Sequence, residues 1–322
     1  MRRSYSYTAF GLTIQSDIPL PLTEIDGKKD GFHLQIRKGR IPKLFQNSED
    51  GRLYTQLENG RFLCRIPNVA NFLIDPLQEI LVDARANADL ESIRLFLLGS
   101  AMGVVLHHQQ GLVLHGNAIS HKDEALIFSG PSGIGKSTLA TAAVYAGYKI
   151  LSDDIAMIRF PAESSPKVSP GYPQLKLWES TLKAFEISSQ KLKSIYNRID
   201  KFNLPIPRSF DARTLPVRNI FTLKVEDRND LRFQRLTGRN AFLALHSNTY
   251  RIEFLNQIGD RRVHFERCGD LLKRTAIYEL CRPQVGYDPI KMIDECINFR
   301  ENKTDESLDG DHTPQTQSSR TL

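Results

Sequence analysis

Cysteine is scarce in this chain of 322 residues, and its placement suits neither metal nor redox chemistry. Cys64, Cys268, Cys281 and Cys296 form no C-x-x-C pair, which argues against a zinc site and against a redox dithiol. Four thiols are also too few for a disulfide framework in a chain of this length. We therefore expect a protein of the reducing cytoplasm.

Long apolar runs are missing as well. The longest, residues 93–106, has about 14 residues, whereas a membrane-spanning helix needs roughly 20. Arg2 and Arg3 stand near the start, but the apolar segment that signal peptides require, twin-arginine signals included, does not follow them. The sequence thus predicts neither export nor a membrane partner, and residues 93–106 are interpreted as a buried helix.

Neither sign of charge is in large excess, but charge is unevenly placed. The chain has 43 Lys+Arg and 37 Asp+Glu, a formal net charge of +6. Residues 301–322 carry −3 and the first 300 residues carry +9. With 40% apolar residues the body can bury a core, whereas the polar, acidic tail 301–322 is expected to be disordered. A positive body favours an anionic partner such as a nucleic acid, a nucleotide, a phosphate group or a membrane surface, and charge alone does not choose among them.

Strand patterns dominate residues 1–86 and predict a small β-rich N-terminal domain. Glu58-Asn59-Gly60 suits a tight hairpin turn, because Asn and Gly tolerate positive φ. No long helical pattern occurs before residue 86. The predicted strands cover residues 9–14, 32–36, 53–57, 61–66, 72–74 and 80–82.

Residues 87–300 are interpreted as a larger α/β domain, and two domains suit the length of the chain. Apolar residues recur at helical spacing over residues 89–107, which predicts a helix. The elements expected next are strands 112–119 and 125–128, a Gly-rich loop, a helix over 136–146 and a strand over 149–151. The two strands that flank the loop and its helix are expected to pair in parallel.

Prolines break residues 161–216, and the segment is basic between residues 183 and 201. We interpret it as irregular, and as a lid over a site or a guide for an acceptor. Asp288 and Pro289 are typical of a helix start. The remaining predictions are strands 220–225 and 231–235 and helices 239–245, 271–280 and 289–299.

Residues 130–137 read Gly-Pro-Ser-Gly-Ile-Gly-Lys-Ser and match the phosphate-loop pattern G-x-x-x-x-G-K-[ST] at every fixed position. Glycines let backbone amides approach a polyphosphate, and the helix that follows directs its positive end at that charge. Lys136 would reach the β- and γ-phosphates, and the Ser137 hydroxyl would bind Mg²⁺. The alternative is a plain Gly-rich turn, but an apolar strand before the loop and a helix-compatible run after it favour nucleotide binding. The expected nucleotide-binding residues are Gly130, Pro131, Ser132, Gly133, Ile134, Gly135, Lys136, Ser137 and Thr138.

Two adjacent acids, Asp153 and Asp154, follow the predicted strand 149–151. In an α/β sheet, ligands bind at the carboxyl ends of parallel strands, so both acids should lie at the same edge as the phosphate loop. One carboxylate can hold Mg²⁺ and the other can accept a proton from an attacking hydroxyl. A solvated turn is the alternative for an isolated Asp-Asp pair, and the phosphate loop upstream favours the catalytic role.

His115 and Gly116 interrupt the apolar strand 112–119. Glycine inside a strand often marks the close approach of a ligand or another backbone. His115 is therefore a candidate catalytic residue, with a buried structural histidine as the alternative.

Taken together, residues 114–154 resemble the catalytic core of the HPr kinase/phosphorylase family, a distant relative of phosphoenolpyruvate carboxykinase. The resemblance rests on Leu114-His115-Gly116, on the loop 130–137 and on the run 147–154 that ends in Asp153-Asp154. It implies an HPr-kinase-like α/β catalytic domain that transfers a phosphoryl group to a serine hydroxyl. By position, it implies that Asp154 accepts the proton, that Asp153 and Ser137 bind the metal, and that His115 partners the acidic pair.

The sequence also departs from the bacterial members of that family. Thr138 stands where they usually have Glu, and their second signature, with a magnesium-binding Glu and an Arg-Gly pair, is not found. Residues 173–178 occupy the corresponding region. These departures argue against reverse phosphorylase activity and against HPr as the substrate. Residues 7–12 and 173–178 are similar instead to HPr-kinase-like proteins of peptide-biosynthesis clusters, which include kinases of lasso-peptide precursors.

The sequence therefore predicts a cytoplasmic kinase that uses ATP, or another nucleoside triphosphate, with Mg²⁺. Its acceptor would be a peptide or protein serine. Lys176, Arg208, Arg213 and Arg218 are candidates for the positive charge on the transferred group. A kinase of small metabolites and a non-catalytic nucleotide-sensing adaptor are the alternatives, and self-association stays open. Nucleic acid is not an expected partner, because no recognition-helix pattern and no clustering of aromatic and basic strands is found.

Overall fold

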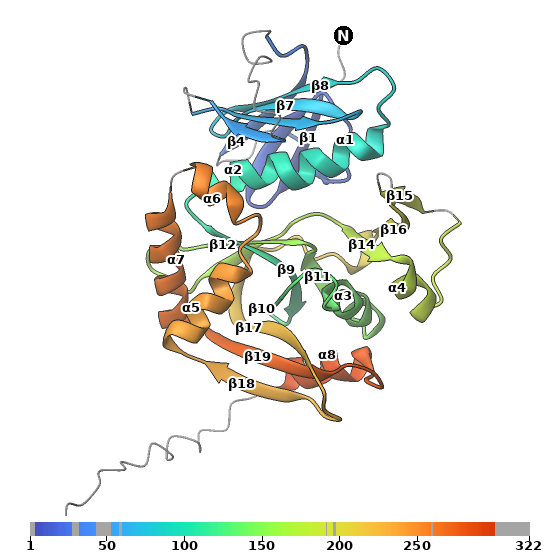
Figure 1. The fold of residues 1–322 in the computed structure, drawn as a ribbon, viewed down its shortest axis with the longest axis vertical. Helices are drawn as coiled ribbons and strands as arrows, with labels where there is room; N and C mark the ends of the chain where they lie inside the picture. The colour runs from blue at the N-terminus through green and yellow to red at the C-terminus, as the bar shows by residue number, and fades with distance from the viewer. Residues whose placement is uncertain are drawn as a thin grey trace, which may run out of the picture.

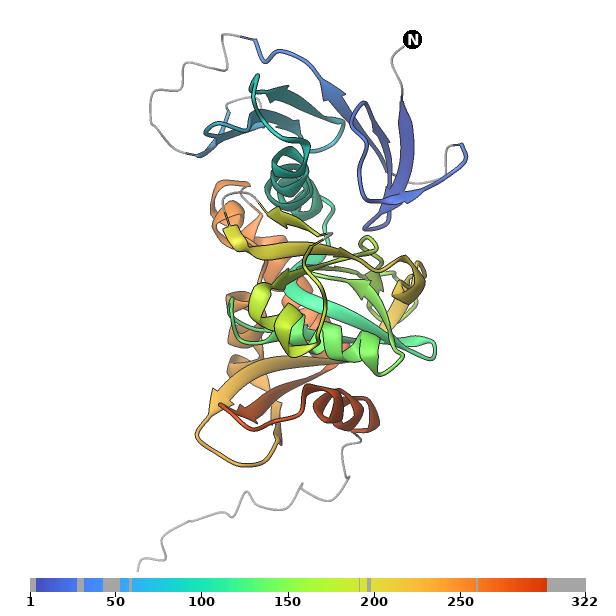
Figure 2. The same cartoon turned by 90° about the vertical axis from the view of Figure 1, so that its right-hand side faces the viewer.

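The computed structural model describes residues 4–27, 32–42, 53–57, 60–190, 192–195, 198–258 and 260–299. Within these residues the molecule is mixed α/β, with a β-rich N-terminal sheet and a second mixed sheet (Figure 1). The two sheets are stacked along the long axis, as the side view in Figure 2 shows. The predicted acidic tail, 301–322, lies outside the described residues.

The N-terminal sheet has eight strands among the described residues, in the order β3-β1-β2-β4-β8-β7-β6-β5. β4 pairs in parallel with β2 and β8, and the other pairs are antiparallel. One face of the sheet is apolar and buried, which follows from the two-residue alternation of strands. The strands are β1 (Tyr5–Ala9), β2 (Leu12–Ser16), β3 (Thr23–Glu24), β4 (His33–Lys38), β5 (Tyr54–Gln56), β6 (Phe62–Ile66), β7 (Ala70–Asp75) and β8 (Glu79–Ala84).

The predicted strand over residues 9–14 is wrong, because the chain reverses there. Phe10 and Gly11 have φ of 56° and 73°, and Ala9 pairs with Leu12 across a two-residue turn. Phe10 is fully buried, so apolar residues continue through the turn and the sequence pattern does not indicate where the strand ends. The predicted β5–β6 hairpin is present, although Glu58 and Asn59 lie outside the described residues.

A helix beneath this sheet covers its apolar face and leads to the second sheet (Figure 1). It runs through α1 (Leu90–Phe96), the π-helical turn η2 (Leu97–Ala101) and α2 (Met102–His108), and Asp89 caps its start by accepting from the Ser92 amide. The helix is longer than the apolar run 93–106. It has 19 residues, and a stretch of 18 of them has a mean hydropathy of 1.4, so it is long and apolar enough to cross a membrane. Since 72% of that 18-residue stretch is buried inside the molecule, packing within the protein explains why the helix is so apolar.

The second sheet has the strand order β10-β9-β12-β13-β17-β19-β18 among the described residues, with β11 against β9 and a further parallel pairing of β10 with β17. Helices α3 and α8 cover one face and α5 and α7 cover the other. The strands are β9 (Leu112–His121), β10 (Glu124–Ser129), β11 (Lys149–Ser152), β12 (Ile155–Arg159), β13 (Lys167–Ser169), β17 (Leu215–Glu226), β18 (Arg232–Leu236) and β19 (Ala276–Pro283). The helices are α3 (Lys136–Tyr145), α5 (Gly238–Ser247), α6 (Glu253–Ile258), α7 (Arg261–Arg274) and α8 (Pro289–Asn298).

The strands around the phosphate loop are not paired as predicted. β10 and β11 run in the same direction, but β9 lies between them and is antiparallel to both. The outcome at the sheet edge is nevertheless the expected one. Ser129 at the end of β10 pairs with Gly116, and Ser152 at the end of β11 pairs with Ala118, so both strands end beside the same part of β9.

Two further predictions need correction. The helix predicted over residues 271–280 is wrong, because α7 ends at Arg274 and β19 begins at Ala276; Thr275 between them is extended, with φ −140°. The segment 161–216 is also more regular than predicted. It contains β13 and a three-stranded sheet whose order is β14-β16-β15. Its elements are β14 (Gln174–Trp178), α4 (Glu179–Ala184), β15 (Lys193–Ile195), β16 (Arg198–Pro205) and η3 (Pro207–Ser209).

Candidate active site

The phosphate loop connects β10 to α3, as the motif predicts. Gly135 has φ of 109° and occupies the position before α3, so the chain enters the helix without a side-chain cap. The amides of the first helical turn have no intrahelical partner, and the positive end of the helix dipole lies there. The residues between Gly130 and Lys136 thus form a loop that can surround an anion.

Lys136 is buried and its ammonium is folded back over the start of the loop. Its Nζ donates to the carbonyl oxygens of Gly130 at 2.7 Å and Pro131 at 2.9 Å. Burial lowers the pKa of Lys136 to about 8, against the opposing effect of Asp154 and Asp153. The charge that would meet a terminal phosphate therefore lies at the Gly130–Pro131 end of the loop.

Asp154 lies in a strained backbone position between two basic side chains. Its φ is 70°, a left-handed conformation that Asp tolerates better than most residues. Its carboxylate lies 3.0 Å from Lys176 Nζ and 3.3 Å from His115 Nδ1. Burial alone would raise the pKa of Asp154, but Lys176 and His115 outweigh it and lower the pKa well below its usual range. Asp154 is therefore an anion at neutral pH.

Asp153 has a different environment from its neighbour. It is buried, and its Oδ2 accepts a hydrogen bond from the Lys176 amide at 2.7 Å. Burial, together with the charge of Asp154, raises the pKa of Asp153 to about 6. The two acids thus differ in both exposure and acidity, which suits two different roles.

His115 faces Asp154 from β9. Its Nδ1 lies 3.1 Å from the Asp154 carbonyl oxygen, in addition to the carboxylate contact. Burial lowers the pKa of His115, more than Asp154 raises it, so the ring is neutral at pH 7 and can donate from Nδ1. Gly116 beside it has no room for a side chain, since a Cβ would lie 2.6 Å from the Phe128 carbonyl oxygen of β10. The close backbone approach expected at this glycine is thus present.

Asn117 is a site residue that the sequence did not single out. It is 1% exposed, its Nδ2 donates to the Lys136 carbonyl at 2.7 Å, and its Oδ1 accepts from the Asp154 amide at 3.3 Å. It therefore ties the start of α3 to Asp154. The available signal was its spacing, because residues two apart on a strand share a face and His115 was already a candidate.

Lysines supply the positive charge of the site, whereas the three arginine candidates lie elsewhere. Arg213 pairs with Asp211 and Asp123 on the surface, and Arg218 donates to the carbonyls of Ile297 and Phe299. Arg208 is exposed and borders neither of the cavities described next. Lys176 and Lys201 come instead from the three-stranded sheet, and the Lys201 ammonium lies 5.1 Å from the centre of the Trp178 ring.

Two cavities meet at Asp154. The first, here called the loop cavity, has a volume of about 120 Å³. It is lined by His115, Asn117, Ser132, Gly133, Gly135, Lys136, Ser137, Thr138, Asp153, Asp154, Lys176, Trp178, Ser180, Thr181 and Lys201. The second, the β17 cavity, has a volume of about 660 Å³. It is lined by His115, Gly130, Pro131, Ser132, Asp154, Thr222, Leu223, Lys224, Ser247, Asn248, Thr249, Tyr250, Arg251, Glu253 and Glu279.

The loop cavity gathers most of the predicted site residues. The segment 161–216 contributes residues to this cavity and none to the β17 cavity, so its described part lies beside the phosphate loop. Ser137 and Asp153 line the same cavity and offer a hydroxyl and a carboxylate, the oxygen ligands that Mg²⁺ prefers. Ile134 lines neither cavity, and its carbonyl accepts from Arg282 at 2.8 Å, so it supports the loop from outside.

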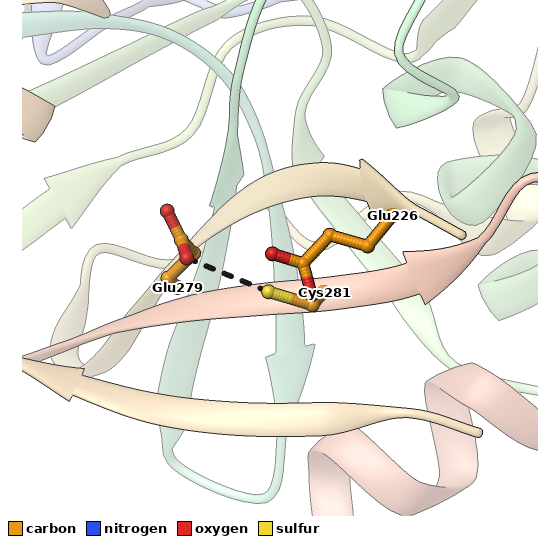
Figure 3. A group of neighbouring side chains, drawn as sticks. All are labelled: Glu226, Glu279 and Cys281. Atoms are coloured by element: carbon orange, nitrogen blue, oxygen red, sulfur yellow. Dashed lines mark hydrogen bonds between the residues drawn. The ribbon is translucent and has the colours of Figure 1, made fainter. Parts of the chain in front are cut away.

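A separate cluster of potential metal ligands lies on the second sheet. Figure 3 shows Glu226 of β17 beside Glu279 and Cys281 of β19. Basic side chains already contact its carboxylates: Lys224 pairs with both acids, and Arg228 and Arg232 pair with Glu226. We interpret this cluster as an ion-pair network.

Comparisons with known proteins match only part of the chain. No protein-family model and no curated protein matches it. Among solved structures, it is similar to the Hpr(Ser) kinase/phosphatase from Coxiella burnetii, at 13% identity and a TM-score of 0.33. The similarity covers 58% of this chain and 94% of that chain. At this TM-score the overlap is partial, so the chemistry of the site is judged from its own residues.

Proposed function

We propose that this protein is a magnesium-dependent kinase that transfers the terminal phosphoryl group of ATP, or a related nucleoside triphosphate, to a serine hydroxyl. The observation that carries the proposal is the place of Asp154. Asp154, which is ionised, lines both cavities, and Lys136 lines one of them, the loop cavity. A proton acceptor at the junction of a phosphate site and a second cavity is the arrangement that phosphoryl transfer needs.

Each residue of the site has its own role in this proposal. The loop amides and Lys136 bind the phosphates, and Ser137 and Asp153 would hold Mg²⁺, which neutralises phosphate charge. Asp154 orients the serine hydroxyl and takes its proton as the serine oxygen bonds to phosphorus and the bond to the nucleoside diphosphate breaks. His115 and Lys176 hold the Asp154 carboxylate in place and keep it ionised.

The sequence likeness supports a narrower proposal about the acceptor. Residues 7–12 and 173–178 are similar to HPr-kinase-like proteins of peptide-biosynthesis clusters, so a ribosomally made precursor peptide, such as a lasso precursor, is the acceptor we propose.

A labelling experiment tests the proposed function. Wild-type protein is incubated with Mg²⁺ and ATP labelled on its terminal phosphate, with a serine-containing peptide library, with cell proteins, or with free serine and other hydroxyl metabolites. We expect label on serine in peptides or proteins. Label only on small molecules would support a metabolite kinase instead. Binding of ATP without label on any acceptor would support a nucleotide-sensing adaptor.

A further inference from the structure

The β17 cavity is the larger of the two cavities at Asp154, and from the phosphate loop only Gly130, Pro131 and Ser132 line it. Its walls include the start of the phosphate loop, the carboxyl end of β17 and residues 247–251 at the end of α5 and just beyond it. Only His115, Ser132 and Asp154 also border the loop cavity. The volume of about 660 Å³ falls in the range of natural ligand sites.

The start of the phosphate loop faces this cavity, although Lys136 itself lines the loop cavity. Lys136 Nζ, which contacts β- and γ-phosphates in such loops, lies at the Gly130–Pro131 end. That end borders the β17 cavity, whereas Ser137 and Thr138 border the loop cavity alone. A group bound in the β17 cavity is thus adjacent both to the end of the loop that Lys136 Nζ contacts and to Asp154.

The wall of this cavity contains an unpaired strand edge. β10 ends at Ser129, opposite Thr222, but β17 continues to Glu226. Beyond Thr222, β17 pairs with β19 on its other edge, and no described strand pairs with residues 223–226 on the β10 side. Leu223 and Lys224 of this stretch line the cavity. A free strand edge can bind an extended peptide through main-chain hydrogen bonds.

The charges of the cavity also suit a polypeptide better than a polyanion. Lys224 lies 3.3 Å from Glu279, and Arg251 lies 3.8 Å from Glu253. Each basic side chain of the outer wall is thus matched by an acid. A phosphate-rich ligand would find no net positive charge there.

We propose that the β17 cavity is the acceptor site and that it binds an extended peptide segment along the edge of β17, with the acceptor serine at Asp154. This inference rests on the kinase function proposed above and names the class of its substrate.

A cavity-filling variant tests the assignment. Ser247 is exposed at the end of α5 and lines the cavity. Ser247→Trp should reduce phosphorylation of a degenerate decapeptide library with one central serine at least tenfold, through a higher KM. The dissociation constant of a fluorescent ATP analogue should stay within twofold of the wild-type value. Leu243→Trp, on the same helix, 45% exposed and outside the cavity, is the matched control and should change neither quantity.

The outcomes separate this inference from the proposed function. If wild type labels the library and Ser247→Trp labels it at the same KM, the acceptor-site assignment is wrong and the kinase function stands. If Ser247→Trp loses ATP-analogue binding, the cavity belongs to the nucleotide. If wild type labels free serine but not the library, the peptide class is wrong. If wild type labels no acceptor at all, the proposed function fails and this inference fails with it.

Discussion

The two cavities that meet at Asp154 differ in charge and in the part of the chain that builds them. The loop cavity is lined by three lysines, Lys136, Lys176 and Lys201, and by two acids, Asp153 and Asp154. In the β17 cavity, Lys224 and Arg251 are each matched by an acid of the same wall. The difference suggests that one side recognises a polyanion by charge, while the other recognises a chain by shape and main-chain hydrogen bonds, and that one carboxylate serves both.

The largest change predicted on the phosphate side follows from Lys136→Met. Loss of this ammonium should lower kcat/KM for ATP by about 10²–10³, the usual cost of one lost transition-state charge contact. Steady-state kinetics with varied ATP measures it. Lys149→Met, an exposed lysine at the start of β11, is the control and should have little effect. A normal kcat/KM in the Lys136→Met enzyme would show that the loop cavity does not bind the phosphates of ATP.

Lys176→Met should reduce stability as well as activity, because it leaves the Asp154 carboxylate with one basic neighbour fewer. Breaking a buried ion pair costs about 3–5 kcal/mol, and we expect about 2–3 kcal/mol here since Asp154 keeps some contact with solvent. Denaturant unfolding measures the change. Lys183→Met removes the exposed pair with Glu179 and should cost less than about 0.5 kcal/mol. Equal losses of unfolding free energy in the two variants would show that the Lys176–Asp154 pair stabilises the fold no more than an exposed ion pair does.

Asn117 connects the two halves of the site, so Asn117→Ala should misplace Asp154 relative to Lys136. We expect kcat to fall by about 10–10²-fold, since small displacements of reacting groups have effects of this size. Nucleotide affinity should change much less. Asn71→Ala in the N-terminal sheet is the control. A lower melting temperature with unchanged kcat would assign Asn117 a purely structural role.

The smallest predicted effect concerns His264, which supports the β17 cavity through a 2.8 Å contact of its Nε2 with Thr249 Oγ1. Burial lowers the pKa of His264 from 6.5 to about 4. As pH falls, this histidine takes up a proton in the unfolded chain before it does so in the folded protein. The stability that the neutral, buried His264 contributes is therefore complete above pH 6.5 and is lost as pH falls toward 4. Between pH 7 and pH 5.5 the loss should be about 1 kcal/mol.

Urea unfolding at the two pH values measures this loss, with His264→Gln as the comparison. The variant should show a pH dependence weaker by that amount. Equal pH dependence in both proteins would mean that His264 does not titrate as its burial indicates.

The sequence predicted the loop cavity far better than the β17 cavity, for a physical reason. His115, the loop 130–138 and Asp153–Asp154 lie within about 40 consecutive residues, and their spacing alone brings the two strand ends together. The walls of the β17 cavity join distant parts of the chain, such as Pro131 and Leu223, which are 92 positions apart. Their meeting depends on the pairing of β10 with β17, which no local pattern encodes.

The fold shows the same limit. Hydrophobic periodicity located the helix that became α1–α2, the β9–β10 hairpin and α8 with its Asp288 cap. It failed where apolar residues continue across a boundary, at Phe10–Gly11 and at Thr275. It also could not show that β9 separates β10 from β11, because strand order is a property of the packed sheet.

The central claim is that Asp154 is the proton acceptor shared by the two cavities, and Asp154→Asn tests it most directly. Wild type and variant are compared for transfer of labelled phosphate from ATP to the serine peptide library, and for binding of a fluorescent ATP analogue. Asn keeps the shape of the side chain but cannot accept the proton, so kcat should fall by about 10²–10⁴ while the analogue still binds. Transfer at the wild-type rate by Asp154→Asn would contradict the account.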